Sequence, residues 1–354
     1  MGFDLNLKNH IFTMLTNVIP NSSSLNIENM THHTIENSNI FSHIYFIDIS
    51  FTDLKTTEIV NQELVIKIAR DNNPFFIKLW EHEVLMLGTW YDSDIPVPKV
   101  LAFDSTYSEG PVIIMEKITG VSLTDSITQN RSDTNIVKNL MSKYAELMVL
   151  VHNYDWKSKF NDPFGSDHEI FTKEGDNSLK IFVSSFRERS KKLGLSLITK
   201  VIDWLVTKTQ DLENKQLLGL VHSDMNTDNI IVSPSGELYL IDWNWTRIVD
   251  IRIDIMWSEG FTVKIFNEEL GDLLLELYLK KSPIPISDLD FFKMLNIVRF
   301  LVNTVNHMKE QKNTDKADTF VRTIDWNMYE KRIKNITGIE STNLRSEIEE
   351  CLNS

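Results

Sequence analysis

The fold is decided by two stretches, His222-Ser223-Asp224-Met225-Asn226-Thr227-Asp228-Asn229 and Ile241-Asp242-Trp243, which a short hairpin joins. Asp224 lies five residues before Asn229 on a loop that enters a strand, and Asp242 ends the next strand. Because a short hairpin brings the two strand ends together, we expect Asn229 and Asp242 to face one site. These could be ordinary loop and turn residues, but the hairpin and Asp242 together favour a chemical role. A carboxylate beside a few hard oxygen ligands for Mg²⁺ is the set that phosphoryl transfer requires.

The composition limits the class of protein. The 354 residues are 42% hydrophobic and 24% charged, as in ordinary globular proteins, and the length suggests about two domains or one domain of two lobes. Lys and Arg number 36 and Asp and Glu number 50, giving a net charge of −14 that argues against a nucleic-acid partner. Only 12 residues are glycine, about half the usual share of roughly 7%.

Cysteine usage and apolar runs favour a cytoplasmic protein. The single cysteine, Cys351, excludes an intramolecular disulfide and cysteine-rich zinc sites, which fits a reducing compartment. The N-terminal residues have no basic segment with a long apolar run, so we expect no signal peptide. The longest apolar runs, such as 147–151, are far below the roughly 18–20 residues of a membrane span, so we expect no membrane partner.

The hydrophobic pattern changes along the chain. Residues 1–30 are expected to form a helix and then a loop, and a second helix is expected to begin near Pro74 and end at the prolines of 95–98. Strand-like runs occupy 40–49, 64–69 and 112–115. After residue 117, helical patterns dominate, at 135–152, 196–212, 273–279, 289–308 and 319–336.

The His-x-Asp pattern with Asn229, the hairpin and Ile-Asp-Trp resembles the aminoglycoside phosphotransferase and choline kinase-like families. Asp250 and Asp254, four residues apart, continue that pattern, and the similarity extends over roughly residues 35–305. The resemblance implies an α+β, bilobal protein-kinase-like fold. Residues 1–117 are then the N-lobe, a small nucleotide-binding antiparallel sheet with one helix. Residues 118–354 are a mainly helical C-lobe with the catalytic loop (222–254) and C-terminal acceptor-binding helices.

The resemblance also implies roles for the central residues. Asp224 corresponds to the catalytic carboxylate, and Asn229 and Asp242 to the ligands of Mg²⁺. Lys67, in the middle of a strand, corresponds to the lysine that contacts the ATP phosphates, although it could be an outward-facing strand lysine. A helix carboxylate pairs with that lysine, and Glu83 fits the family's helix better than Glu81.

Further roles follow from the same resemblance. The adenine is expected to meet the carbonyl of Glu116 and the amide of Ile118, with Met115 bordering the pocket. His222 and Asp254 are expected to brace the catalytic loop, although Asp254 could be a helix cap. Acceptor contacts are expected at Trp245, Asp250 and Glu259, and an aromatic cage that includes Trp243 and Trp257 would suit a cationic substrate.

This chain departs from the family pattern at two places where glycine would be expected. Ser223 stands where the family usually has glycine, and the phosphate-covering turn expected at 37–43 contains no glycine. Eleven residues separate Asp242 from Asp254, and no Ala-Pro-Glu element follows, which argues against a protein kinase. The hypothesis is an ATP- and Mg²⁺-dependent kinase for a hydroxyl of an aminoglycoside-like, choline-like or other small molecule. The alternative is a catalytically weak nucleotide-binding pseudokinase or scaffold.

Overall fold

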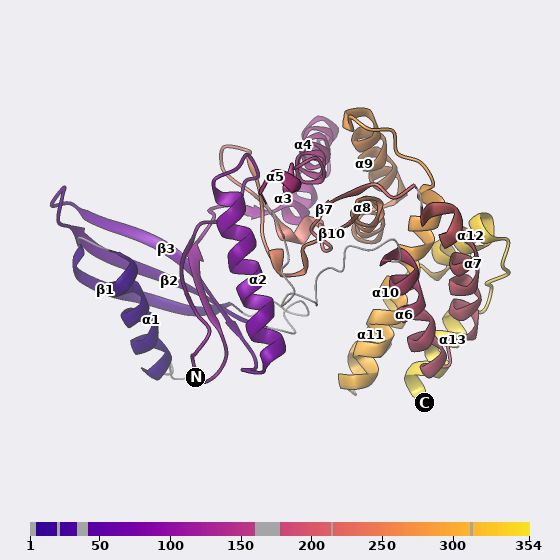
Figure 1. Ribbon diagram of the computed structural model, residues 1–354, viewed down its shortest axis with the longest axis horizontal. Coiled ribbons are helices and arrows are strands. Elements are labelled where there is room, and N and C mark those ends of the chain that lie inside the picture. The colour runs from indigo at the N-terminus through magenta and orange to yellow at the C-terminus, as the bar shows by residue number, and fades with distance from the viewer. Residues whose placement is uncertain (1–4, 20–21, 34–41, 160–177, 214, 312–313) are drawn as a thin grey trace. The chain divides into compact units, whose positions relative to one another are not determined.

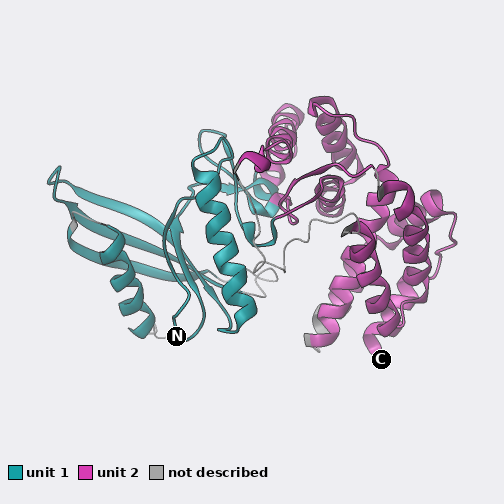
Figure 2. Ribbon diagram, in the orientation of Figure 1, with its two compact units in different colours: residues 1–126, 228–246 teal, residues 127–227, 247–354 magenta. Residues whose placement is uncertain are grey.

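The computed structural model describes residues 5–19, 22–33, 42–159, 178–213, 215–311 and 314–354. It divides into two compact units, one of residues 1–126 with 228–246 and one of residues 127–227 with 247–354 (Figure 2). The lobe boundary expected after residue 117 stays a prediction, because a division into compact units is not a division into lobes. Within the described ranges, no helix is both long and apolar enough to cross a membrane.

The first unit contains a five-stranded antiparallel sheet in the order β1-β2-β3-β5-β4 (Figure 1). The sheet and its helices are α1 (Leu5–Val18), β1 (Ser22–His33), β2 (Ser42–Asp53), β3 (Ile59–Ala69), α2 (Pro74–Tyr91), β4 (Val100–Asp104) and β5 (Val112–Glu116). A smaller sheet has the order β6-β8-β9 and consists of β6 (Val121–Ser122), β8 (Ile230–Val232) and β9 (Leu238–Leu240). The 3-10 turns η1 (Thr227–Asn229) and η2 (Trp243–Trp245) flank this hairpin.

The two faces of the large sheet carry different side chains. Because side chains alternate along a strand, Ile66 and Ile68 of β3 point to one face and Lys67 to the other. Ile66 and Ile68 belong to a buried core with Leu7 and Ile11, which lie four residues apart on one side of α1. Lys67 is therefore directed away from α1, and its ammonium group contacts α2 instead.

Two strands of this sheet were not expected from the sequence. The loop expected after the first helix is wrong, since Ser22–His33 forms β1 and pairs with β2. This strand is rich in serine, asparagine and histidine and has two register shifts, so no clean alternation of apolar residues marks it. β4 is short, and its burial pattern contains one buried residue, Ala102.

The second unit is mainly helical. Its described elements are α4 (Thr134–His152), α5 (Trp156–Lys159), α6 (Ser178–Lys192), α7 (Ser196–Glu213), β7 (Leu218–Val221), β10 (Arg247–Asp250), α8 (Arg252–Ile265), α9 (Glu268–Lys281), α10 (Leu289–Gln311), α11 (Thr314–Thr323), α12 (Trp326–Thr337) and α13 (Leu344–Asn353). The helix α3 (Leu123–Gln129) crosses from the first unit into the second. One large core joins α6, α7 and α10 to the C-terminal helices. The predicted α+β class, with an antiparallel sheet followed by helices, is confirmed.

A two-stranded sheet holds both ends of the central motif in this unit. β7 and β10 pair antiparallel, with Val221 opposite Arg247 and Leu218 opposite Asp250. β7 leads directly into His222, and β10 leads into α8, which carries Asp254. This pairing therefore fixes the start of the loop next to the first turn of α8.

Candidate functional site

Lys67 is buried in a cluster of ion pairs. It is 7% exposed, and its Nζ donates to Glu83 Oε1 at 2.9 Å, to Glu83 Oε2 at 2.7 Å and to Asp242 Oδ1 at 2.5 Å. Glu83 is 1% exposed, whereas Glu81, the other carboxylate considered, is exposed. Burial alone would lower the pKa of Lys67, but the carboxylates of Asp242 and Glu83 raise it above its ordinary value. Lys67 is therefore held as an ammonium ion, and the outward-facing position considered from the sequence is wrong.

The start of α2 and its aromatic side chains position Glu83. The side chain of Asn73 accepts from two amides of the first turn, and Pro74 occupies a position where no amide hydrogen is needed. Trp80, fully buried, lies one turn before Glu83, and its ring is 5.2 Å from the Lys67 ammonium group. An aromatic face adds a favourable contact for that cation.

The β8–β9 hairpin brings Asn229 and Asp242 into one part of the first unit. The Ile241 amide donates to the Asn229 carbonyl at 3.0 Å, so the residues that follow and precede the hairpin strands are neighbours. Asp242 has left-handed backbone angles, φ 67° and ψ 59°, which are uncommon for a residue other than glycine. The next residue, Trp243, is fully buried, and its ring lies 5.6 Å from that of Trp90 in α2. Packing of this tryptophan holds Asp242 in place beside Lys67.

The expected adenine residues lie at the end of β5. The register pairs Val65 with Met115 and Lys67 with Ile113, so Met115 is on the same sheet face as Lys67. Met115 is buried, and Glu116 and Ile118 are half-buried. Most of the expected phosphate-covering turn lies outside the described residues, which resume at Ser42.

In the second unit, Asp224 is held by two donors. Its Oδ1 accepts from Asn226 Nδ2 at 2.9 Å and from Trp257 Nε1 at 3.0 Å. The carbonyl of the intervening residue, Met225, accepts from Tyr144 of α4 and Ser258 of α8. Helices from two parts of the unit thus fix the loop and direct the half-buried Asp224 carboxylate.

Asp254 connects the same loop to α8. Its Oδ2 accepts from the His222 amide at 2.6 Å and its Oδ1 from the Ser223 amide at 2.9 Å. His222 and Asp254 are both fully buried. The cap residue of α8 is Ile251, so the helix-cap alternative for Asp254 is wrong. The geometry agrees with a bracing position for both residues.

Ser223 has a left-handed backbone, φ 70°, at the position where glycine was expected. Its Oγ accepts from Arg247 Nε at 3.0 Å, and its carbonyl accepts from Arg299 at 2.5 Å. Burial, together with the nearby charge of Arg299, lowers the pKa of Arg247. The hydrogen bond that the serine side chain accepts from Arg247 thus offsets part of the strain of a left-handed backbone at a residue other than glycine.

Replacement of Ser223 by glycine and by alanine should therefore differ. Ser223→Gly relieves about 1–2 kcal/mol of left-handed strain but removes a hydrogen bond from a charged donor, so stability should change by less than about 1 kcal/mol. Ser223→Ala keeps the strain and loses the hydrogen bond, at a cost of about 1–3 kcal/mol. Denaturant unfolding of both variants measures this order. An alanine variant at least as stable as the glycine variant would contradict it.

The expected acceptor residues are not brought together as a set. Asp250 is 2% exposed and accepts from Arg252 at 2.7 Å and 2.9 Å, which makes it part of a buried ion pair. Glu259 is 1% exposed and accepts from Arg332. Trp245 lies in the first unit, 6.3 Å from the ring of Phe75. We therefore leave Asp250 and Glu259 out of the acceptor contacts, because both carboxylates are buried against arginines.

Three residues around Asp224 were not assigned to it from the sequence. Asn226 is two residues away and could have been noticed as a local partner. Trp257 was considered only for a substrate cage, and Arg299, whose guanidinium lies 4.0 Å from the Trp257 ring, carries no local signal. Trp257 reaches Asp224, and Arg299 reaches the neighbouring Ser223 carbonyl, only through tertiary packing.

The described side chains also bear on metal binding. They contain no group of three or more His, Cys, Asp and Glu residues arranged to hold a metal ion. Asn229 and Asp242 offer oxygen atoms only, the ligand type that Mg²⁺ prefers, and Mg²⁺ commonly needs few protein ligands. This donor set therefore fits Mg²⁺ and does not fit zinc.

Known proteins share this architecture. A family model described as a phosphotransferase enzyme family matches residues 55–283. The GDP complex of a mutant aminoglycoside 2'-phosphotransferase IIIa is 13% identical, with 89% of this chain and 97% of that chain covered and a TM-score of 0.60. ADP-bound aminoglycoside phosphotransferase APH(2'')-Ib is 15% identical, with 99% of each chain covered and a TM-score of 0.58.

A choline kinase from Streptococcus pneumoniae is also similar, with 16% identity, 94% of this chain and 100% of that chain covered, and a TM-score of 0.57. No curated protein sequence matches the chain significantly. At these identities the likeness to solved structures shows the fold alone. It confirms the fold that the resemblance of residues 222–254 implied.

Proposed function

Because the chain belongs to this phosphotransferase enzyme family, we propose that it transfers the γ-phosphoryl group of ATP to a hydroxyl of a small molecule. The observation that supports this proposal most is the buried Lys67 ammonium group, held between Glu83 and Asp242. Groups with perturbed pKa values are enriched at functional sites, and a lysine held as an ammonium ion is a charge that can contact a polyphosphate. A chain of net charge −14 has to supply such positive charge locally.

The proposed reaction is a direct displacement. A new bond forms between the acceptor oxygen and the γ-phosphorus, the bond from that phosphorus to the bridging oxygen of the β-phosphate breaks, and ADP leaves. Asp224 orients the acceptor hydroxyl and receives its proton. Asn226 and Trp257 hold the Asp224 carboxylate by donating to Oδ1, so the carboxylate needs little rearrangement before it acts.

The remaining residues of the set bind the nucleotide. Lys67 contacts the phosphates of ATP, and Glu83 keeps the lysine in position. Asn229 and Asp242 would hold Mg²⁺, which when bound neutralises charge on the phosphate oxygens. Glu116 and Ile118 provide the backbone groups for the adenine ring, with Met115 beside it.

Two measurements test the proposal. Mg-ATP at about 100 times its dissociation constant should stabilise the protein by about 2.7 kcal/mol in thermal unfolding. ATP labelled at the γ-phosphate should then transfer label to at least one member of a panel of aminoglycosides, amino alcohols, polyols, hydroxy acids and sugar phosphates. Absence of stabilisation would contradict the proposal. Stabilisation with no transfer and no hydrolysis would instead support a nucleotide-binding scaffold.

A further inference from the structure

Arg299 of α10 reaches the loop that carries Asp224. Its guanidinium donates to the Ser223 carbonyl at 2.5 Å and lies 4.0 Å from the centre of the Trp257 ring. Trp257, on α8, in turn donates from its indole Nε1 to Asp224 Oδ1 at 3.0 Å. Arg299 is therefore connected to Asp224 by two routes, one through the backbone of the loop and one through an indole ring.

The first route acts on the backbone. The Ser223 carbonyl belongs to the planar peptide group that joins Ser223 to Asp224. A hydrogen bond to that carbonyl fixes the orientation of the peptide group from which the Asp224 backbone continues. Because Ser223 has a left-handed backbone, this orientation persists only where surrounding contacts hold it.

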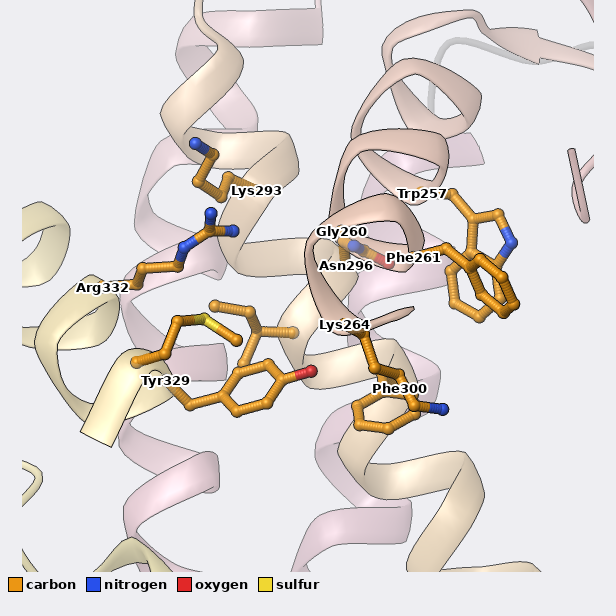
Figure 3. A pocket seen from close by; sticks show the side chains of 11 residues that line it. Trp257, Gly260, Phe261, Lys264, Lys293, Asn296, Phe300, Tyr329 and Arg332 are labelled. Carbon is orange, nitrogen blue, oxygen red and sulfur yellow. The ribbon is translucent and has the colours of Figure 1, made fainter. Parts of the chain in front are cut away.

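The second route acts on the carboxylate. Figure 3 shows Trp257 and Phe261 on the same side of α8, one turn apart. A guanidinium over the face of an indole is attracted to the ring and limits its rotation. The contact with Arg299 therefore keeps the Nε1 atom of Trp257 directed at Asp224.

The two helices that carry this contact pack closely beside it. A Cβ atom at Gly260 of α8 would lie 2.2 Å from Asn296 Nδ2 of α10, so this position has no room for a side chain. The same Nδ2 donates to the Met256 carbonyl at 2.8 Å. Asn296 lies one turn before Arg299, and Gly260 lies one turn after Trp257. The packing of α8 on α10 thus fixes the distance between the indole and the guanidinium.

A salt bridge does not account for the charge of Arg299. Among the residues that the structure describes, no carboxylate lies close enough to its guanidinium to form one. Burial lowers the pKa of Arg299, and the charges of Asp224 and Asp254 partly oppose this shift. A half-buried cation without a salt bridge costs free energy, which a neutral side chain would avoid. An effect on Asp224 accounts for a cation at this position.

We propose that Arg299 is a positioning residue of phosphoryl transfer, which fixes the backbone of Asp224 through the Ser223 carbonyl and its carboxylate through Trp257. This inference rests on the proposed function and adds a residue to it. The residues assigned to the nucleotide belong to the first unit, whereas Arg299 and Trp257 belong to the second. Loss of Arg299 should therefore slow transfer without weakening the binding of Mg-ATP.

The test measures kcat and KM of three variants. Arg299→Met removes both the donor and the cation, and Trp257→Phe removes the indole N–H but keeps a ring. Each should lower kcat by about 10–100-fold, while the KM values change by less than about threefold. Arg299→Lys keeps a donor and a cation, so its kcat should stay within about fivefold of the wild type. ADP release is measured with Mg-ATP and the alcohol of the panel above that takes up label fastest, or with water if none does.

A double-mutant cycle shows whether Arg299 acts through Asp224. In the Asp224→Asn background, the group that Arg299 positions no longer takes a proton. Arg299→Met should then lower the remaining kcat by less than about threefold, because residues that act as a unit do not have additive effects.

Two substitutions control for lost stability alone. Arg189 of α6 lies 4.6 Å from the centre of the Phe186 ring and donates to Asn303 of α10 at 2.9 Å. Trp326 of α12 donates from its indole to the Val321 carbonyl at 2.8 Å. These partners lie outside the catalytic loop, so Arg189→Met and Trp326→Phe should leave kcat unchanged.

The indole can also be followed without turnover. In protein labelled with ¹⁵N-tryptophan, the side-chain resonance that is lost in Trp257→Phe belongs to Trp257. Arg299→Met should shift this resonance, because it removes the cation over the ring, and Arg189→Met should leave it in place.

Three results would overturn the inference alone. They are a kcat of Arg299→Met within about threefold of the wild type, an equal loss in the Asp224→Asn background, and an equal loss in Arg189→Met. If Arg299→Met does not fold, Arg299→Gln, which lacks the charge, takes its place with the same expected losses. A protein that binds no Mg-ATP and releases no ADP would instead contradict the proposed function, and the Trp257 resonance would still report the contact with Arg299.

Discussion

Replacement of Asp224 by asparagine should lower kcat by about 10²–10⁴-fold while Mg-ATP binding changes little. Asparagine has the same shape, and its side-chain oxygen can still accept from Trp257 and Asn226, so the loop should keep its geometry. What the variant lacks is the negative charge that orients the acceptor hydroxyl and takes its proton. ADP release in the presence of the acceptor gives kcat, and thermal shift with Mg-ATP gives nucleotide binding.

Asp228→Asn is the matched control for this variant. Asp228 is an exposed aspartate four residues later in the same loop, and we assign it no part in the reaction. Its substitution should alter kcat by no more than a few fold. An Asp224→Asn enzyme that retains kcat within about tenfold of the wild type would rule out Asp224 as the proton acceptor.

Substitution of Lys67 by methionine should both destabilise the protein and abolish transfer. The change leaves the buried Glu83 carboxylate without its cation, which costs about 3–5 kcal/mol of unfolding free energy. The double variant Lys67→Met/Glu83→Gln removes both charges and should recover most of this stability, yet stay inactive. Denaturant unfolding and ADP release together separate the two roles.

Glu81→Gln is the control on the same helix. Glu81 is exposed, so its substitution should change the free energy of unfolding by less than about 0.5 kcal/mol. If Glu81→Gln were as damaging as Glu83→Gln, or if the double variant were active, the assignment of Lys67 to the phosphates would be wrong.

The stabilisation that the Lys67–Glu83 ion pair provides depends on pH in a defined way. Because the pKa of Lys67 is raised in the folded state, its stabilising effect is complete below the ordinary lysine pKa of about 10.4 and is lost only as pH rises through the raised value. The stability difference between wild type and the double variant Lys67→Met/Glu83→Gln, in which neither side chain titrates, should therefore be nearly constant between about pH 7 and pH 9.

The sequence predicted the parts of the site that depend on short spacings. Asn229 and Asp242 flank one hairpin, and Asp254 follows Asp242 within a short segment, so local geometry constrains them. Glu83 could be preferred over Glu81 because helix length fixed its distance from the following prolines. The contacts that direct Asp224 come from farther away, since Trp257 is 33 residues later and Arg299 contacts a residue 76 positions before it.

Long-range packing also explains features that the local sequence did not indicate. Asp250 and Glu259 carry charges that suit a cationic substrate when considered alone. Arg252 and Arg332 neutralise them in the folded chain, and nothing in the local sequence indicates that Arg332 lies against Glu259. β1 was missed for a similar reason, because its pairing with β2 and not its own composition makes it a strand.

The position of Asp242 in the chain has a consequence for biosynthesis. The first unit needs residues 228–246 to be complete, and Lys67 meets Asp242 across 175 residues of sequence. At about 5–20 residues per second, a ribosome needs roughly 10–35 s to make that interval. The strands of the large sheet, which end at Glu116, are therefore synthesised well before Asp242 and the β8–β9 hairpin, and for that time Lys67 has Glu83 but not Asp242 as a partner. The buried ammonium group of Lys67 thus gains its second carboxylate only late in synthesis.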